Sequence, residues 1–362
     1  MMDRMIKRIL VPLFIVITFL AYGQSDKEKA QLLGETAIKL MDEGKIEESM
    51  QLLEQAQKLD STRFDYPYEI ALAHYQLNDY NATIEILEKI SGYNDITDHY
   101  YQLLGNSYDN IKNTDKAVET YQAGLKKFPE SGRLYLELGI IQMSKKEYTK
   151  AVNYFEKGIE VEPSFPSNYY WAAKFYCSST EKVWGMIYGE IFMNLERNSK
   201  RTAEISKLLF DTYKSSITIS SKSSMSIHFC HQMVMNADVL KDTSKMKLPF
   251  CMAYEMTTLT SMAFEKKIDI NSLDNIRDNF LSAYFKNGYN TTYPNVLYDY
   301  QHKVLDAGYI DAYNHWILMK GDEDNFNKWQ AKNKDNWDKF LTWFKDNQLH
   351  VDASNKFLSK QY

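Results

Sequence analysis

The chain has 362 residues, of which 44% are hydrophobic and 25% are charged, and its net charge at pH 7 is −5. This composition is that of a globular protein long enough for two domains. With 14 glycines, 7 prolines and 27 tyrosines, it favours long helices over a turn-rich β protein. A mildly acidic chain without a concentrated lysine and arginine stripe repels phosphate backbones, so no nucleic acid partner is expected.

The first 23 residues have the features of a secretory leader. Basic side chains precede an apolar run from Ile9 to Leu20, and residues 21–23 offer small side chains at a cleavage site. The run is shorter than the roughly 20 apolar residues that span a bilayer. We therefore predict a signal peptide at 1–23, cleaved before Gln24, and export to the periplasm or the exterior without a transmembrane anchor. An uncleaved membrane anchor is the alternative.

Two copies of one 34-residue pattern run back to back between residues 98 and 165. Small and bulky side chains occupy eight matching positions: Tyr101, Leu104, Gly105, Tyr108, Ala117, Tyr121, Gly124 and Pro129 in the first copy, and Tyr135, Leu138, Gly139, Gln142, Ala151, Phe155, Gly158 and Pro163 in the second. This pattern resembles the tetratricopeptide repeat, whose unit is a helix-turn-helix. The resemblance implies an all-α interaction scaffold and does not identify what is bound.

The same register continues more weakly on both sides of these copies. We predict units at 30–63, 64–97, 98–131 and 132–165, and a degenerate fifth unit at 166–199, which together make a repeat array over residues 24–199. Neighbouring units complete each other's core. The residues predicted to pack the repeats are Ala37, Ala71, Gly105, Gly139, Ala117, Ala151, Pro129 and Pro163.

Two further features follow from this register. The turns between paired helices should contain Gly44, Asn78, Asn113 and Lys146, of which Gly44 and Asn78 suit a left-handed closing residue. The second helix of the fifth unit, Trp184–Leu195, is unusually aromatic and apolar. Because an exposed terminal unit should be polar, we expect the rest of the chain to cover this helix.

The resemblance also implies which side chains face a partner, because the first helix of each pair lines the concave face of such arrays. The corresponding residues here are Tyr68, Leu72, Tyr75, His99, Gln102, Asn106, Asp109, Arg133, Leu136, Ile140, Tyr170 and Lys174. Aromatic and amide side chains suit a peptide held by stacking and backbone hydrogen bonds. A clamp for a terminal carboxylate is less favoured, since Gln102 stands where a cation is expected. A solvated face, or one filled by the protein's own C-terminal segment, are the other interpretations.

Residues 200–362 lose the 34-residue register and are predicted to form a separate, mostly helical domain of unknown type. Apolar periodicity predicts helices at 201–215, 248–266, 272–287, 295–318 with a break near Gly308, and 325–346. Alternation of apolar residues around a serine-rich stretch predicts one β-hairpin, with Ile217, Ile219, Met225, Ile227 and Phe229 on its strands.

Three cysteines, Cys177, Cys230 and Cys251, are an odd number, so they cannot all pair with one another. A Cys230–Cys251 disulfide would suit an exported protein. Buried free thiols are the alternative, and the sequence favours them.

No metal site, cofactor or catalytic residue is predicted. His228 and His231 bracket Cys230, but on a strand residue 231 faces away from the other two, whereas a metal needs converging ligands. We expect His302 and His315 to pack or cap. The acidic residues Asp299, Asp306, Asp311, Asp322, Glu323 and Asp324 are interpreted as solvated or as favouring a helix dipole. A hydrolase-like C-terminal domain with the array as docking arm, and a purely structural protein, remain the alternatives to a peptide-binding scaffold.

Overall fold

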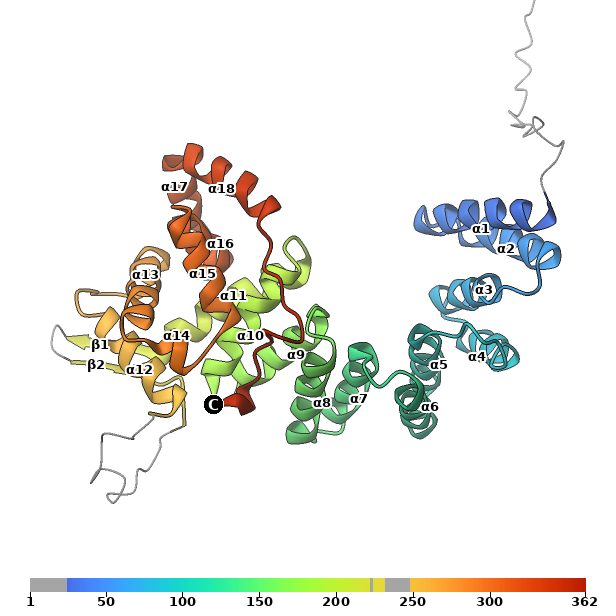
Figure 1. The fold of residues 1–362 in the computed structure, drawn as a ribbon, viewed down its shortest axis with the longest axis horizontal. Coiled ribbons are helices and arrows are strands. Elements are labelled where there is room, and N and C mark those ends of the chain that lie inside the picture. The colour runs from blue at the N-terminus through green and yellow to red at the C-terminus, as the bar shows by residue number, and fades with distance from the viewer. Residues whose placement is uncertain (1–24, 222–223, 232–247) are drawn as a thin grey trace, which may run out of the picture. The chain divides into compact units, whose positions relative to one another are not determined.

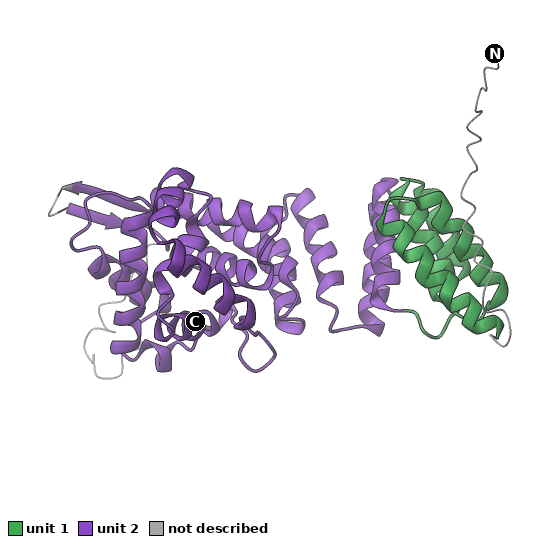
Figure 2. Ribbon diagram, turned by 90° about the horizontal axis from the view of Figure 1, so that it is seen from above, with its two compact units in different colours: residues 1–96 green, residues 97–362 purple. Residues whose placement is uncertain are grey.

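The computed structural model describes residues 25–221, 224–231 and 248–362. In these ranges the chain is all-α apart from one two-stranded antiparallel sheet, as the sequence predicts (Figure 1). The predicted signal peptide lies outside the described residues. Within them, no helix combines the length and apolar character needed to cross a membrane. Contacts divide the chain into two compact units, residues 1–96 and 97–362 (Figure 2), whereas the boundary predicted near residue 199 falls inside the second unit.

The first unit contains two helix pairs, which are α1 (Asp26–Asp42) with α2 (Ile46–Leu59) and α3 (Asp65–Gln76) with α4 (Tyr80–Lys89). Ala37 and Ala71, at equivalent repeat positions, are both fully buried. Across each pair the hydroxyl of the second helix donates to the alanine carbonyl of the first, from Ser49 at 2.7 Å and from Thr83 at 3.2 Å. The weakened repeats therefore keep the same crossing as well as the same register.

The second unit begins with three more pairs in the predicted register. They are α5 (Asp98–Asn110) with α6 (Thr114–Lys127), α7 (Gly132–Ser144) with α8 (Tyr148–Val161), and α9 (Pro166–Cys177) with α10 (Lys182–Leu195). A Cβ atom added to Gly105 would lie 2.7 Å from Cδ1 of Tyr121, and one added to Gly139 would lie 2.7 Å from Cδ1 of Phe155. The two glycines thus occupy equivalent helix crossings, which supports the repeat assignment.

Residues with positive φ occur at more positions in the turns within the pairs than the sequence suggested. Gly44 and Asn78 have φ of 78° and 63°, as predicted, but Lys112 and Lys146 also have φ of 66° and 61°. Asn113 lies in its turn and caps α6, with its side chain accepting from the backbone N–H of Lys116 at 3.3 Å. Lysine has no preference for this conformation, so its sequence position carries no signal for it.

The remaining elements are α11 (Lys200–Ser216), β1 (Ile217–Ser221), β2 (Ser224–Ile227), α12 (Phe250–Ser261), α13 (Ile270–Lys286), α14 (Tyr289–Thr292), α15 (Val296–Asp306), α16 (Ile310–Leu318), α17 (Glu323–Lys332), α18 (Lys334–Asp346) and the 3-10 turn η3 (Ser359–Gln361). Ile217 pairs with Ile227 and Ile219 with Met225, so the predicted hairpin forms, but β2 ends at Ile227 and the predicted strand residue Phe229 lies beyond it. Gly308 breaks the long predicted helix, with φ of 79°. The short α14 and the break at Asn333 were not predicted.

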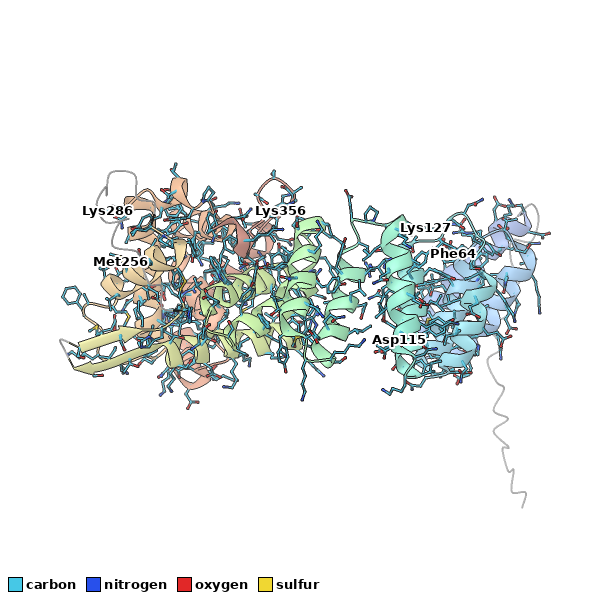
Figure 3. The ribbon with its side chains drawn as sticks, turned by 90° about the horizontal axis from the view of Figure 1, so that it is seen from below. Phe64, Asp115, Lys127, Met256, Lys286 and Lys356 are labelled. Atoms are coloured by element: carbon cyan, nitrogen blue, oxygen red, sulfur yellow. A yellow bond between two sulfur atoms is a disulfide. The ribbon has the colours of Figure 1, made fainter. Side chains whose placement is uncertain are left out.

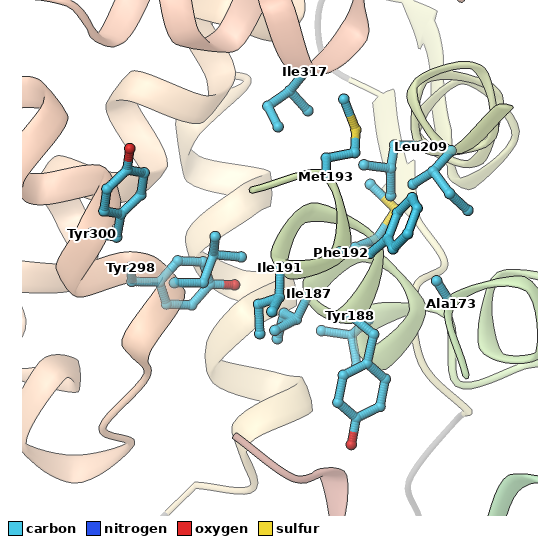
Figure 4. Close-up of a cluster of buried hydrophobic side chains, with 14 of the residues drawn as sticks. Ala173, Ile187, Tyr188, Ile191, Phe192, Met193, Leu209, Tyr298, Tyr300 and Ile317 are labelled. Atoms are coloured by element: carbon cyan, nitrogen blue, oxygen red, sulfur yellow. The ribbon is translucent and has the colours of Figure 1, made fainter. Parts of the chain in front are cut away.

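One hydrophobic core runs through the second unit from Leu136 on α7 to Leu358 near the C-terminus. Its centre is α10, where every residue from Val183 to Asn194 is buried. Figure 4 shows Ile187, Ile191 and Phe192 surrounded by side chains from α9, α11, α15 and α16. The apolar helix of the fifth pair is therefore covered, as expected, and residues 200–362 share their core with the last repeats.

The C-terminal residues return to the repeats and bind the outer side of α8 and α10. The backbone N–H of Ser359 donates to the Tyr188 hydroxyl at 2.8 Å, and the Ser359 hydroxyl donates to Glu156. Lys360 pairs with Glu160 at 2.7 Å. This strap contacts the second helices α8 and α10 and also the Tyr176 hydroxyl on α9, 3.2 Å from the Ser359 hydroxyl.

The cysteines pair in the way that the sequence disfavoured. Cys230 and Cys251 form a disulfide that joins the segment after β2 to α12, so the prediction of free thiols is wrong for these two residues. Cys177 is free and buried, and burial raises the pKa of its thiol to about 12. A bridge between distant segments depends on tertiary proximity, which residue spacing does not report.

Candidate peptide-binding face

The first helices of successive pairs in the second unit lie side by side. Helix α5 contacts α7, α7 contacts α9, and α9 contacts α11, so α11 stands where the first helix of a sixth pair would stand. We call the exposed side of these four helices the first-helix face. The residues predicted to meet a partner in this unit lie on α5, α7 and α9.

Polar side chains link α5 to α7 across this face. Arg133 Nε lies 3.0 Å from Oδ2 of Asp98, and the Gln102 amide donates to Oε1 of Glu137 at 2.7 Å. A further guanidinium nitrogen of Arg133 donates to Oε1 of Gln102 at 3.3 Å. Each contact joins residues 31 to 35 positions apart, so the repeat spacing itself brings these groups together.

A second set of polar contacts links α9 to α11. The Tyr170 hydroxyl donates to Glu204 at 2.6 Å, and the Lys174 ammonium lies 2.7 Å from the same carboxylate. Arg201 donates to the Ser167 hydroxyl at 3.0 Å. Tyr170 is only 7% exposed, so this end of the face is largely occupied by contacts within the chain.

The other predicted residues differ in how much surface they offer. Leu136 is 7% exposed and packs in the core, whereas His99 is exposed beside Asp98. Asn106 is half-buried and accepts a hydrogen bond from the Tyr121 hydroxyl, and Asp109 accepts one from Thr114 at 2.8 Å. Ile140 is half-buried and packs at the edge of the core. The amide-bearing part of the face is therefore the stretch around Gln102 and Asn106.

Glu137 lies at the centre of this stretch, and the sequence reasoning missed it. It is the residue after Leu136, and one residue turns a helix by about 100°. Its spacing of four from Arg133, which places both on one side of α7, was the available signal. On α7 the polar side chain on the first-helix face is therefore that of Glu137, whereas the resemblance had implied its neighbour Leu136.

Two carboxyl groups on the face have pKa values shifted in opposite directions. Burial raises the pKa of Glu137 above its usual value, although hydrogen bonds from Gln102 and Asn106 oppose the shift. Partial burial acts in the same direction on Asp98, but the hydrogen bond from Ser131 and the charge of Arg133 outweigh it and hold the pKa of Asp98 below its usual value. Glu137 therefore binds a proton more readily than Asp98 does.

The first unit carries three of the predicted residues on α3. The Tyr68 ring lies 5.3 Å from the ring of Phe64, and the Tyr75 ring lies 5.3 Å from that of Tyr80. Leu72 packs against the core of this unit. A separate hollow of about 300 Å³ opens between α1 and α3, and it is lined by Gln31, Gly34, Glu35, Ile38, Leu53, Arg63, Asp65, Tyr66 and Glu69.

Acidic and aromatic groups also converge inside the second unit. Glu190 on α10 accepts two hydrogen bonds from the buried Arg277 on α13, at 2.9 and 2.7 Å, and a third from the Tyr313 hydroxyl at 2.9 Å. The cavity beside them measures about 20 Å³. A cavity of this size holds about one water molecule.

Family models described as tetratricopeptide repeat match residues 101–131 and 132–165, which are the pairs α5–α6 and α7–α8. The chain contains tetratricopeptide repeats. It is similar to small glutamine-rich tetratricopeptide repeat-containing protein 2 of Mycosarcoma maydis, with 31% identity over 86 residues. That match spans 24% of this chain and 24% of the relative, so it concerns the repeats alone.

Several solved structures resemble about half of the chain. PilF of Pseudomonas aeruginosa is 18% identical with a TM-score of 0.45, and the match covers 52% of this chain and 85% of PilF. MamA of Desulfovibrio magneticus is 17% identical with a TM-score of 0.37, covering 48% and 98% of the two chains. YrrB, described as having an unusual peptide-binding site, is 15% identical with a TM-score of 0.34, covering 48% and 90%.

Proposed function

We propose that this tetratricopeptide repeat protein is exported and binds a polypeptide segment on the first-helix face of its second unit, around Gln102, Asn106 and Glu137. The observation that carries the proposal is the row of half-buried amide and carboxyl groups on α5 and α7. Amide side chains offer both donors and acceptors, which match the alternating groups of a peptide backbone.

The hydrogen bonds between α5 and α7 favour this use of the face. Arg133 and Gln102 are each held by a partner on the neighbouring helix, so less side-chain freedom remains to be lost when a peptide binds. The half-buried positions of Gln102, Asn106 and Glu137 lower the local dielectric, which strengthens hydrogen bonds made there. At the far end Tyr170 and Lys174 likewise contact Glu204, but Tyr170 is nearly buried, so this end offers less polar surface to a peptide.

Binding is tested with peptides selected from a random library against the mature chain. Replacing Gln102 by alanine removes an amide from the face, and we expect the dissociation constant of a selected peptide to rise by at least about fivefold, the loss of roughly one hydrogen bond. Fluorescence polarisation with labelled peptide measures this change. Unaltered affinity in Gln102→Ala and in Glu137→Gln would contradict the proposal.

A matched control is available on the opposite side of the same pair. Gln122 is exposed on α6, the helix whose ends Asp115 and Lys127 mark in Figure 3. Gln122→Ala removes the same amide from a second helix, and we expect it to leave peptide affinity unchanged. Equal weakening by Gln102→Ala and Gln122→Ala would move the binding surface away from the first-helix face.

Export is the second part of the proposal. It is supported by the leader at residues 1–23 and by the Cys230–Cys251 disulfide, because disulfides persist in oxidising compartments outside the cytosol. N-terminal sequencing of the protein recovered from the producing cell is expected to start at Gln24. A recovered chain that starts at Met1 would refute cleavage at this position.

A further inference from the structure

Side chains from α13 and α16 converge at a point that the peptide-binding proposal does not use. Asp311 and His315 lie one turn apart on α16, and Oδ1 of the first is 2.8 Å from Nδ1 of the second. Asp274 on α13 joins them, so that one ligand atom from each residue lies within 4.8 Å of the others. Ligands at about 2.0–2.2 Å from a single ion lie at most about 4.4 Å apart. The three ligand atoms would therefore need to move only slightly toward one another to coordinate a single ion.

We propose that Asp274, Asp311 and His315 bind a divalent transition-metal ion. Two carboxylates and one imidazole form a mixed oxygen and nitrogen set that suits Zn²⁺ or Mn²⁺. Ca²⁺ and Mg²⁺ prefer sets made of oxygen alone, so the imidazole argues against them. Three protein ligands leave coordination positions for water or for a group on a bound molecule.

Two of the proposed ligands, His315 and Asp274, are held in place by neighbours outside the set. The side chain of His315 is 2% exposed and stacks on the Trp329 indole, with ring centroids 4.0 Å apart and planes within 11°. Asp274 accepts a hydrogen bond from the Asn314 amide at 2.9 Å. The oxygen of that amide accepts from Nε of Arg277 at 2.8 Å, which fixes its orientation. Hydrogen bonds of this kind orient metal ligands and tune their affinity.

The charges at this point also favour a cation. The Asp274 and Asp311 carboxylates lie close together and repel each other when both are ionised. A divalent ion would relieve this repulsion. The Asp311 side chain is 45% exposed, so an ion can reach the site from solvent.

Isothermal titration of the mature chain with ZnCl₂, and separately with MnCl₂, tests the assignment. We expect one saturable ion per chain, bound at least about tenfold more weakly by Asp274→Asn and His315→Gln. Circular dichroism shows whether each variant is folded. Asp311→Asn, at the exposed ligand, is measured as well, so that the test does not depend on a buried substitution.

The pair His302 and Asp306 on α15 provides a matched control. It has the same spacing of four residues, with Nδ1 3.3 Å from Oδ2, but its side chains are 40% and 68% exposed. His302→Gln should leave metal affinity unchanged. The site would be overturned if neither metal bound. It would also be overturned if Asp274→Asn and Asp311→Asn bound the metal as tightly as the wild type, or if His302→Gln weakened binding as much as the ligand variants do. Saturable binding of CaCl₂ in place of both transition metals would overturn the class of ion.

Trp329 adds a readout specific to this point in the fold. Because its ring stacks on His315, metal binding should change the indole fluorescence, and the change should be lost in Trp329→Phe. A fluorescence change that persists in Trp329→Phe would place the ion elsewhere. This signal does not depend on any peptide, so the proposed metal site and the proposed peptide-binding face are tested independently of each other.

Discussion

Helices α8 and α10 hold the same position in consecutive pairs, yet their surroundings differ. Helix α8 buries Ala151, Phe155 and Ile159 and keeps charged side chains on its outer side. Helix α10 buries its whole length from Val183 to Asn194. The 34-residue spacing therefore determines how two helices pair, while the polarity of the outer side reports what covers them. A repeat helix that is apolar all round marks the place where the array joins another part of the fold.

The largest expected effect comes from the buried ion pair that ties α10 to α13. Arg277→Ala leaves Glu190 buried beside Tyr313 without its cation, and we expect the free energy of unfolding to fall by about 3–5 kcal/mol. Chemical denaturation followed by circular dichroism measures this change. The corresponding exposed pair in the first unit, Arg63 with Asp65, is the control, and Arg63→Ala should cost at most about 1 kcal/mol. Similar losses in the two variants would show that burial of the Glu190 pair is unimportant.

A smaller effect is expected at the repeat crossings. Gly105→Val would place side-chain atoms against the ring of Tyr121, and we expect the free energy of unfolding to fall by about 1–3 kcal/mol from overpacking. Gly92 has no heavy atom within 4 Å of an added Cβ, so Gly92→Ala should be close to neutral. Thermal unfolding compares the two. A neutral Gly105→Val would mean that the close crossing is not required for the pair.

The smallest effect concerns the two carboxyl groups on the first-helix face. The pKa of Asp98 is lowered in the folded state, so its contribution to stability is present above the unfolded pKa and is lost as pH falls through the folded one. The pKa of Glu137 is raised, so stability is lost as pH rises from the unfolded pKa to the folded one. Asp98→Asn should therefore reduce stability at pH 7, and Glu137→Gln should increase it. Unfolding curves recorded between pH 3 and pH 7 check the two signs, and changes in the same direction would contradict the opposite environments.

The repeats could be predicted from sequence because their packing depends on residue size at fixed spacing. Gly105 and Gly139 mark the positions where the two helices of a pair approach most closely, and the five pairs appear in the predicted order. The break at Asn333 was hidden because apolar residues such as Trp329 and Trp337 continue on both sides of it. An apolar pattern that spans two helices resembles that of one long helix.

The sites could be predicted only where local spacing creates them. Gln102 and Arg133 meet because the repeat brings positions about one unit apart together, and the resemblance implied both. Asp311 and His315 share a helix, but their partner Asp274 lies on another helix, and only the packing of α13 against α16 joins the three. The disulfide between Cys230 and Cys251 depends in the same way on how distant segments fold together.

The strap around Ser359 has a consequence for the order in which the protein forms. The first unit contains its own core within residues 25–96, so it can fold early during synthesis. The core of the second unit includes Phe357 and Leu358, and the adjoining Ser359 and Lys360 contact Glu156 and Glu160, about 200 positions upstream. Its core thus closes last, after those residues have emerged, and a chain that stops before them would present an incomplete second unit to chaperones and proteases.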